Sequence, residues 1–157
     1  MQHQKSYTLT EAKRKLERYC AYQERCHREV KTKAWEMSMI PEAIDQILVH
    51  LIENNYLNEE RFARSYARGK FNIKKWGRKR IVNELQQRQI SKYNIKNALT
   101  EIDEETYLET LDALAKKRLD QLTETNFLKK RKKLADYLLY RGWESHLVYS
   151  KITTLIK

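Results

Sequence analysis

Apolar side chains recur along most of this chain at intervals of three and four residues, which places them on one face of an α-helix. Three such stripes are Phe62, Ala63 and Tyr66; Ile81, Val82 and Leu85; and Ile95, Leu99 and Ile102. The chain has only 3 glycines and 1 proline, so it has little material for hairpin turns. The pattern predicts an all-α protein whose apolar stripes form a core rather than a cofactor pocket.

Helix-start signals divide the chain into segments. A residue with a short polar side chain accepts a hydrogen bond from the first free N–H groups of a helix, and acidic residues in the first turn complement the helix dipole. Proline also suits a first turn, because its missing N–H is not needed there. The expected helix starts are at Thr8 (with Glu11 in a capping box), Pro41, Asn58, Ser91 and Asp103.

An internal repeat of roughly fifty residues organises these helices. At one constant offset, the positions Ile81, Leu85, Arg88, Ile90, Ile95 and Leu99 match Leu134, Leu138, Arg141, Trp143, Val148 and Ile152. A looser match aligns Trp35 with Leu85 and Ile40 with Ile90, and then, after a one-residue slip, Ile44 with Ile95 and Leu48 with Leu99. We predict an elongated array of three tandem three-helix repeats, at 1–57, 58–102 and 103–157.

The sequence offers no pattern for catalysis, nucleotide binding or metal binding. Glycines occur only at 69, 77 and 142, which excludes the common phosphate-binding loops. The histidines at 3, 27, 50 and 146 lack metal-site spacing, and Cys20 and Cys26 do not form a paired zinc-ligand pattern. We predict a non-enzymatic protein with no cofactor, no metal and buried, reduced thiols.

The apolar runs are too short to cross a bilayer, and the polar opening carries no apolar leader core. The sequence therefore predicts a cytoplasmic monomer without a membrane partner.

Positive charge is concentrated in the middle of the chain. The net charge is +11, and residues 58–102 hold 12 basic and 4 acidic side chains. The first and third segments are nearly balanced, with 9 basic and 8 acidic residues, and 11 and 9. Uneven charge of this kind indicates a polyanionic or acidic partner.

The candidate contact residues are mostly basic side chains interleaved with an aromatic one, a composition suited to phosphates and bases. Arg61, Arg64 and Arg68 are expected on one face of a helix. A second basic run is expected to spread around its helix, so that only part of it faces a partner. The candidates are Arg61, Arg64, Arg68, Lys70, Lys74, Lys75, Trp76, Arg78, Lys79, Arg80, Lys130 and Arg131.

Two blocks of the middle segment resemble motifs of the RecX family. The nine residues from Asn55 to Ala63, N-Y-L-N-E-E-R-F-A, are similar to its G-Y-L-[DN]-D-x-x-F-A signature. Lys75-Trp76-Gly77, Arg80-Ile81 and Glu84-Leu85 resemble its K-x-x-G…R-I-x-x-E-L block, and Cys26 to Val30 resembles an earlier S-x-x-E-L element. This chain departs from the motifs at Cys26, Asn55 and Glu59, which replace Ser, Gly and Asp.

The resemblance implies a regulator that lies in the groove of the RecA recombinase filament on single-stranded DNA. It implies inhibition or modulation of the ATPase, strand-exchange and co-protease activities of that filament, and no catalysis by this chain. The residues alone leave a second class open. A basic three-helix unit also suits direct DNA binding of the helix-turn-helix type, with base-contact candidates on the helix expected at 79–89.

Overall fold

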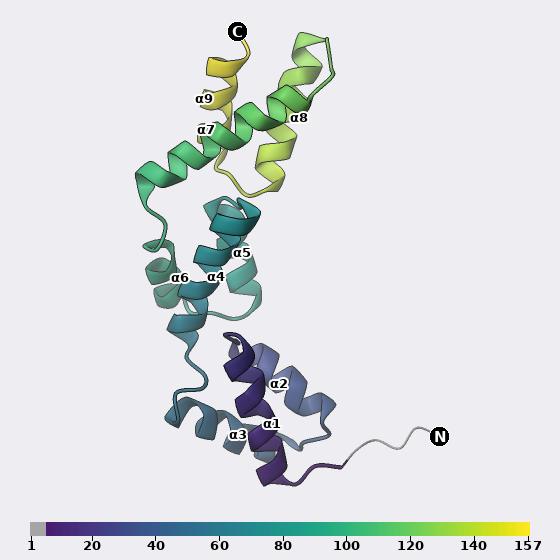
Figure 1. The fold of residues 1–157 in the computed structure, drawn as a ribbon, viewed down its shortest axis with the longest axis vertical. Helices are drawn as coiled ribbons and strands as arrows, with labels where there is room; N and C mark the ends of the chain where they lie inside the picture. The colour runs from purple at the N-terminus through teal and green to yellow at the C-terminus, as the bar shows by residue number, and fades with distance from the viewer. Residues whose placement is uncertain (1–5) are drawn as a thin grey trace, which may run out of the picture.

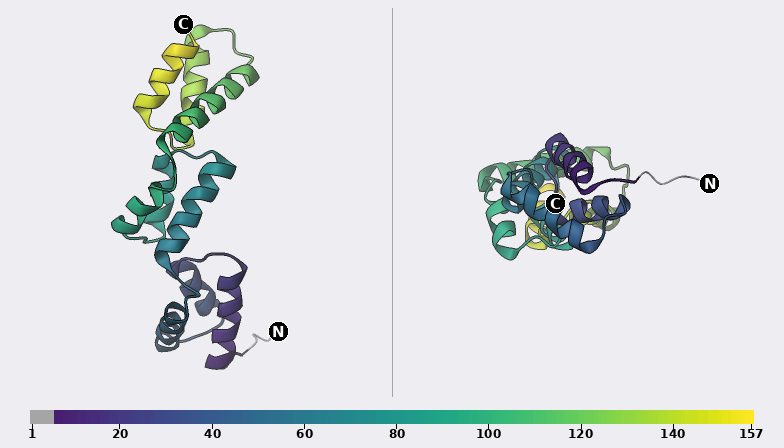
Figure 2. Two further views of the ribbon diagram at one scale, coloured as in Figure 1. Left: turned by 60° about the vertical axis from the view of Figure 1, so that its left-hand side comes forward. Right: turned by 90° about the horizontal axis from the view of Figure 1, so that it is seen from below.

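The computed structural model describes residues 6–157, so His3 and the start of the first expected repeat lie outside the described residues. Nine helices and no strands occur in the described part, which forms an elongated stack of three helical units (Figures 1 and 2). The helices are α1 (Leu9–Tyr22), α2 (His27–Glu36), α3 (Pro41–Glu53), α4 (Glu59–Lys74), α5 (Arg78–Gln87), α6 (Lys92–Leu99), α7 (Glu104–Gln121), α8 (Phe127–Tyr140) and α9 (Ser145–Leu155). The predicted fold class is confirmed.

The expected helix starts are confirmed: α3 begins at Pro41, and the other four starts have capping hydrogen bonds. Thr8 and Glu11 form a reciprocal capping box at α1, with bonds of 3.1 and 3.2 Å. The side chains of Asn58, Ser91 and Asp103 accept hydrogen bonds from the backbone at the starts of α4, α6 and α7. The departure at Cys26 is tolerated, because the Glu29 carboxylate accepts hydrogen bonds from both the backbone N–H and the Sγ of Cys26.

The second helix of each unit ends in the same way. Ser38, Gln89 and Gly142 follow α2, α5 and α8, and all three adopt positive φ, at 62°, 61° and 90°. This left-handed residue turns the chain toward the third helix of each unit.

The looser match proposed for the first unit is wrong by one residue. Ala34 is fully buried and occupies the place of Leu85, whereas Trp35 is 67% exposed. No slip in the loop is needed, because this register also pairs Ile44 and Leu48 with Ile95 and Leu99. The match from sequence was wrong because a large apolar side chain such as Trp35 is the more obvious core candidate. The rotation of the helix instead places the small side chain of Ala34 inside.

The apolar side chains form two cores rather than three. One core belongs to α1–α3 and ends at Leu57. The other runs without interruption from Phe62 in α4 to Ile156 after α9, with Cys26 as its one contribution from the first unit. The second and third units are therefore joined by a common interior, and the division at 57/58 and 102/103 stays a prediction about folding units.

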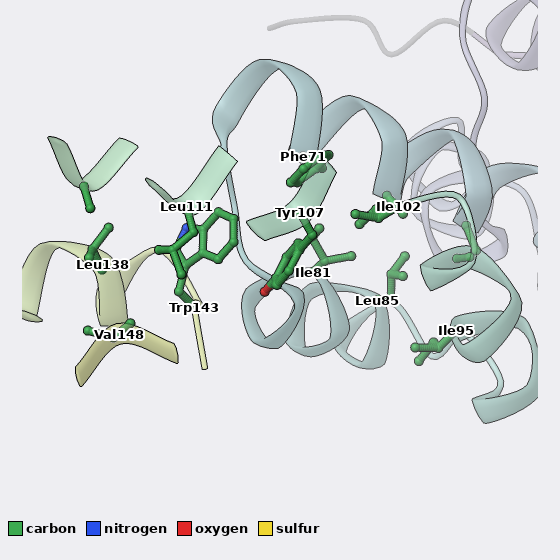
Figure 3. Packing of buried hydrophobic residues seen from close by; sticks show 14 of the residues in the cluster. Phe71, Ile81, Leu85, Ile95, Ile102, Tyr107, Leu111, Leu138, Trp143 and Val148 are labelled. Atoms are coloured by element: carbon green, nitrogen blue, oxygen red, sulfur yellow. The ribbon is translucent and has the colours of Figure 1, made fainter. Parts of the chain in front are cut away.

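Aromatic side chains fill the junction between the second and third units. Trp143 and Tyr107 are fully buried, with ring centroids 4.4 Å apart, and Phe71 stacks on Tyr107 at 5.8 Å (Figure 3). Trp143 Nε1 donates to the carbonyl oxygen of Lys75 at 3.1 Å. Each aromatic pair adds about 0.5–1.5 kcal/mol beyond the burial of its area.

Backbone groups also pair across this junction. The N–H of Gly77 donates to the Arg141 carbonyl at 2.8 Å, and the N–H of Lys79 donates to the Gly142 carbonyl at 3.0 Å. A Cβ on Gly77 would overlap the backbone of Gly142, and a Cβ on Gly142 would overlap Arg80. The close approach therefore depends on both glycines.

The described residues include two free thiols, those of Cys20 and Cys26, and both are buried. Burial raises the pKa of Cys20 to about 11 and also raises the pKa of Cys26. No group of side chains suited to hold a metal ion and no helix that could span a membrane occurs among residues 6–157.

We expect Gly142→Ala to lower the free energy of unfolding by roughly 1–3 kcal/mol from its positive φ alone, with the overlap against Arg80 added. Gly69→Ala is the matched control, because a Cβ there meets nothing within 4 Å. In the interior of α4 this control should raise stability by roughly 0.5–1 kcal/mol. Urea denaturation of both variants measures the difference, and equal effects would contradict the close approach.

The folded protein should resist thiol reagents at pH 8. A thiol with a pKa of about 11 is ionised in roughly one molecule per thousand at that pH, and only the thiolate reacts. Labelling with a chromogenic disulfide should be slow in buffer and complete for both cysteines in guanidinium. Rapid labelling of one thiol in the native state would contradict this burial.

Candidate nucleic-acid interface

The three arginines of α4, which the sequence places on one predicted contact face, form intramolecular ion pairs. Arg61 Nε lies 2.6 Å from Glu24 Oε1 of the first unit, and its other nitrogens donate to Asn55 and to the Tyr56 carbonyl. Arg61 therefore joins the first unit to the second, with most of its donors occupied.

Arg64 and Arg68 share a carboxylate within their own unit. Both lie near Glu101 Oε1, at 3.0 and 3.3 Å, and Arg64 also contacts Glu60 at 3.2 Å. The hydrogen bond from Arg64 lowers the pKa of the Glu101 carboxyl. These two arginines are partly neutralised where they lie.

Arg78 belongs to the junction rather than to an outer surface. Its guanidinium lies 3.8 Å from the ring centre of Tyr107 and pairs with Glu104 and with Glu144, the latter at 3.0 Å. The Tyr107 hydroxyl accepts from the Arg78 N–H at 3.0 Å and donates to Glu144. Burial, followed by this bond to Glu144, raises the pKa of Tyr107, so the hydroxyl stays protonated as a donor.

Basic and aromatic side chains alternate along a second surface, which we call the aromatic–cationic strip. Lys70 Nζ lies 5.4 Å from the Tyr66 ring centre and 5.1 Å from that of Trp76. The Arg80 guanidinium lies 4.2 Å from the Trp76 ring centre and 5.0 Å from that of Tyr140 in the third unit. With Arg88 at 4.9 Å from the Tyr66 ring centre, the strip comprises Tyr66, Lys70, Trp76, Arg80, Arg88 and Tyr140.

Within the strip, Lys70 and Arg80 have no carboxylate within ion-pair distance among the described residues, whereas Arg88 pairs with Glu84 at 2.9 Å. Cations stacked on aromatic rings, with their charge unneutralised, suit the phosphates and bases of a nucleic-acid strand. Three further lysines are exposed here: Lys74 at the end of α4, Lys75 in the turn that follows, and Lys79 in the first turn of α5.

Lys130 and Arg131 are not brought to the strip. Arg131 lies against Phe127, 5.4 Å from its ring centre, and against Thr153. This half of α8 lies at the end of the molecule away from the middle unit, whereas Tyr140 ends α8 near that unit (Figure 1).

Tyr66 and Tyr140 of the strip are absent from the predicted set, and Arg88 is predicted only as a base-contact candidate of the helix-turn-helix alternative. The i, i+4 spacing of Tyr66 and Lys70 was a usable signal in the sequence. The approach of Tyr140 to Arg80 joins residues sixty positions apart and follows only from the junction.

The fold and this surface define a class: a tandem three-helix repeat protein with a basic, aromatic middle. The family model described as "RecX, second three-helix domain" matches residues 58–99, and "RecX, third three-helix domain" matches residues 104–152. The chain belongs to the RecX family.

Individual relatives agree with this assignment. The chain is 32% identical over 103 residues to a protein of Serratia proteamaculans named "Regulatory protein RecX", covering 66% of this chain and 60% of that one. A protein of the same name from Clostridioides difficile is 26% identical over 113 residues, with 72% and 53% covered. The chain thus spans little more than half the length of these two relatives.

Solved structures share the architecture. A crystal structure of regulatory protein RecX matches with a TM-score of 0.83 and 25% identity, over 93% of this chain and 73% of that one. RecX from Lactobacillus salivarius matches with a TM-score of 0.80 and 24% identity, over 94% and 96%.

We expect Lys70→Gln/Arg80→Gln to flatten the salt dependence of binding to single-stranded DNA by about 1.4 in log affinity against log salt. Each phosphate contact on a single strand contributes about 0.7. Arg64→Gln/Arg68→Gln removes the same charge from the same unit and should change the slope less, because Glu101 already neutralises these arginines in part. Anisotropy titrations at several salt concentrations measure the slopes. An equal change in both variants would mean that net charge, rather than the strip, governs binding.

Proposed function

We propose that this chain is a regulator that binds a RecA-type recombinase filament on single-stranded DNA and inhibits or modulates its ATPase, strand exchange and co-protease activities. Membership of the RecX family supports the regulatory part of the proposal. The single observation that carries the binding mode is the aromatic–cationic strip, which continues from the second unit into the third.

The shape of the molecule supports a large, extended partner. Three units stacked end to end present a long surface, and the second and third share one core. Contacts made by one unit hold the next near its own site, so that later contacts form at high effective concentration. A filament groove with repeating sites suits such an array.

Direct helix-turn-helix recognition of duplex DNA is less well supported. On α5, two of the polar candidates for base contact, Glu84 and Arg88, pair with each other at 2.9 Å. Asn83, Gln86 and Gln87 remain exposed there. We infer that α5 contributes mainly to the packing of the middle unit and to the strip.

The chain then acts by binding rather than by catalysis, and we expect no ATPase, nuclease or protease activity of its own. Pure protein, with each substrate in turn, should give no turnover above buffer.

The decisive measurement is the single-strand-dependent ATPase of the recombinase from the same organism. Intact protein at or below stoichiometric levels should lower the rate. Lys70→Gln/Arg80→Gln should need several-fold more protein for the same effect, because two phosphate contacts are lost. Arg64→Gln/Arg68→Gln serves as the control of equal charge.

Two results would count against the proposal. One is an unchanged ATPase rate at all protein concentrations. The other is inhibition only at concentrations that saturate bare DNA, which would indicate competition for the strand rather than action on the filament.

A further inference from the structure

An open cleft of ≈ 620 Å³ lies between the end of α7, the loop that follows it, and α8. Its walls carry Arg118, Lys133, Asp136, Tyr137, Tyr140 and Arg141. Two of these charges are neutralised by neighbours: Lys133 Nζ lies 3.0 Å from Glu124, and the Asp136 carboxylate lies 2.7 Å from Lys132.

The two arginines of the cleft are not neutralised. Their guanidinium carbons lie 4.7 Å (Arg118) and 3.7 Å (Arg141) from the centre of the same Tyr137 ring. Among residues 6–157, neither has a carboxylate within ion-pair distance, and the Nε of Arg118 is buried without a hydrogen-bond partner. Two like charges beside one ring repel each other, so an anion held between them is favoured.

We propose that this cleft is a phosphate-binding site for a single-stranded nucleic acid. Guanidinium groups match phosphate oxygens with paired hydrogen bonds, and both arginines line this cleft. The ligand is a phosphodiester of the strand.

The rim of the cleft favours a strand over an acidic peptide. Tyr140 lines the cleft, is 73% exposed and offers a face on which a base stacks. The same ring lies 5.0 Å from the Arg80 guanidinium, so the cleft continues directly into the aromatic–cationic strip. A carboxylate-bearing peptide gains nothing comparable from a row of aromatic faces.

The cleft is also held in place relative to the strip. The carbonyl of Arg141 accepts the Gly77 N–H at 2.8 Å, so the backbone that carries one cleft arginine is tied to the middle unit. A strand bound at both sites therefore meets a prearranged track across two units.

The test measures binding of the intact chain to a fluorescein-labelled thymidine oligonucleotide of about 20 residues by anisotropy. Arg118→Gln/Arg141→Gln should weaken binding about tenfold and flatten the salt slope by about 1.4, because two phosphate contacts are lost. The matched control, Lys117→Gln/Lys129→Gln, removes the same charge from the third unit outside the cleft, and should weaken binding less than about twofold.

A second variant guards against a folding defect. Tyr140→Ala removes an exposed ring, so it should leave the melting temperature unchanged while weakening oligonucleotide binding several-fold.

Three outcomes would overturn the proposal. The first is an equal loss of affinity in the control and cleft variants. The second is a cleft variant that no longer binds a polyglutamate peptide of matched charge but still binds DNA as the unaltered protein does. That result would make the cleft an acidic-peptide site. The third is competition by micromolar thymidine monophosphate, which would indicate a mononucleotide site.

This inference does not rest on the proposed function, because it concerns the chain and DNA alone. A protein that binds the strand through the cleft but leaves recombinase ATPase unchanged would sustain the site and reject the regulator.

Discussion

The close approach of the second and third units at Gly77 and Gly142 is the constraint on which the rest of the molecule depends. Without side chains there, the backbone N–H groups of Gly77 and Lys79 donate to the carbonyls of Arg141 and Gly142 at 2.8 and 3.0 Å, and Trp143 enters the core of the neighbouring unit. A single small three-helix unit buries little area, so the shared aromatic core gives stability that neither unit supplies alone. The junction also sets where Arg80, Tyr140 and Arg141 lie, and so fixes the surface that we propose binds nucleic acid.

The first unit is joined to the second by different chemistry. Arg61 pairs with Glu24 and Arg28 donates to the Gln87 carbonyl, while Cys26 alone among residues 6–57 enters the large core. Polar, partly exposed contacts of this kind are weaker than a buried aromatic junction. The second and third units thus share one core, whereas the first unit is attached to them mainly through ion pairs and hydrogen bonds. This difference affects how the array follows the surface of a large partner.

The basic side chains discussed above fall into two groups, according to whether a carboxylate lies beside them. Arg61, Arg64, Arg68 and Arg78 lie beside carboxylates and stabilise the array. Lys70, Arg80, Arg118 and Arg141 lie on aromatic rings, and no carboxylate of residues 6–157 is within ion-pair distance of them. Charges of the first kind are already compensated, and charges of the second kind remain available to an anion. We infer that the second kind, distributed over two units that share one core, forms the nucleic-acid surface.

The sequence by itself determined the helical class, the helix starts and the repeat, because helix capping and apolar spacing act over a few residues. It misplaced Trp35, since hydrophobicity alone does not give the rotation of a short helix. It did not reveal the ion pairs of the α4 arginines, because their partners Glu24 and Glu101 lie in turns far along the chain. Only the tertiary structure decided which cations are neutralised and brought Tyr140 to Arg80, since those contacts follow from how the units pack rather than from local spacing.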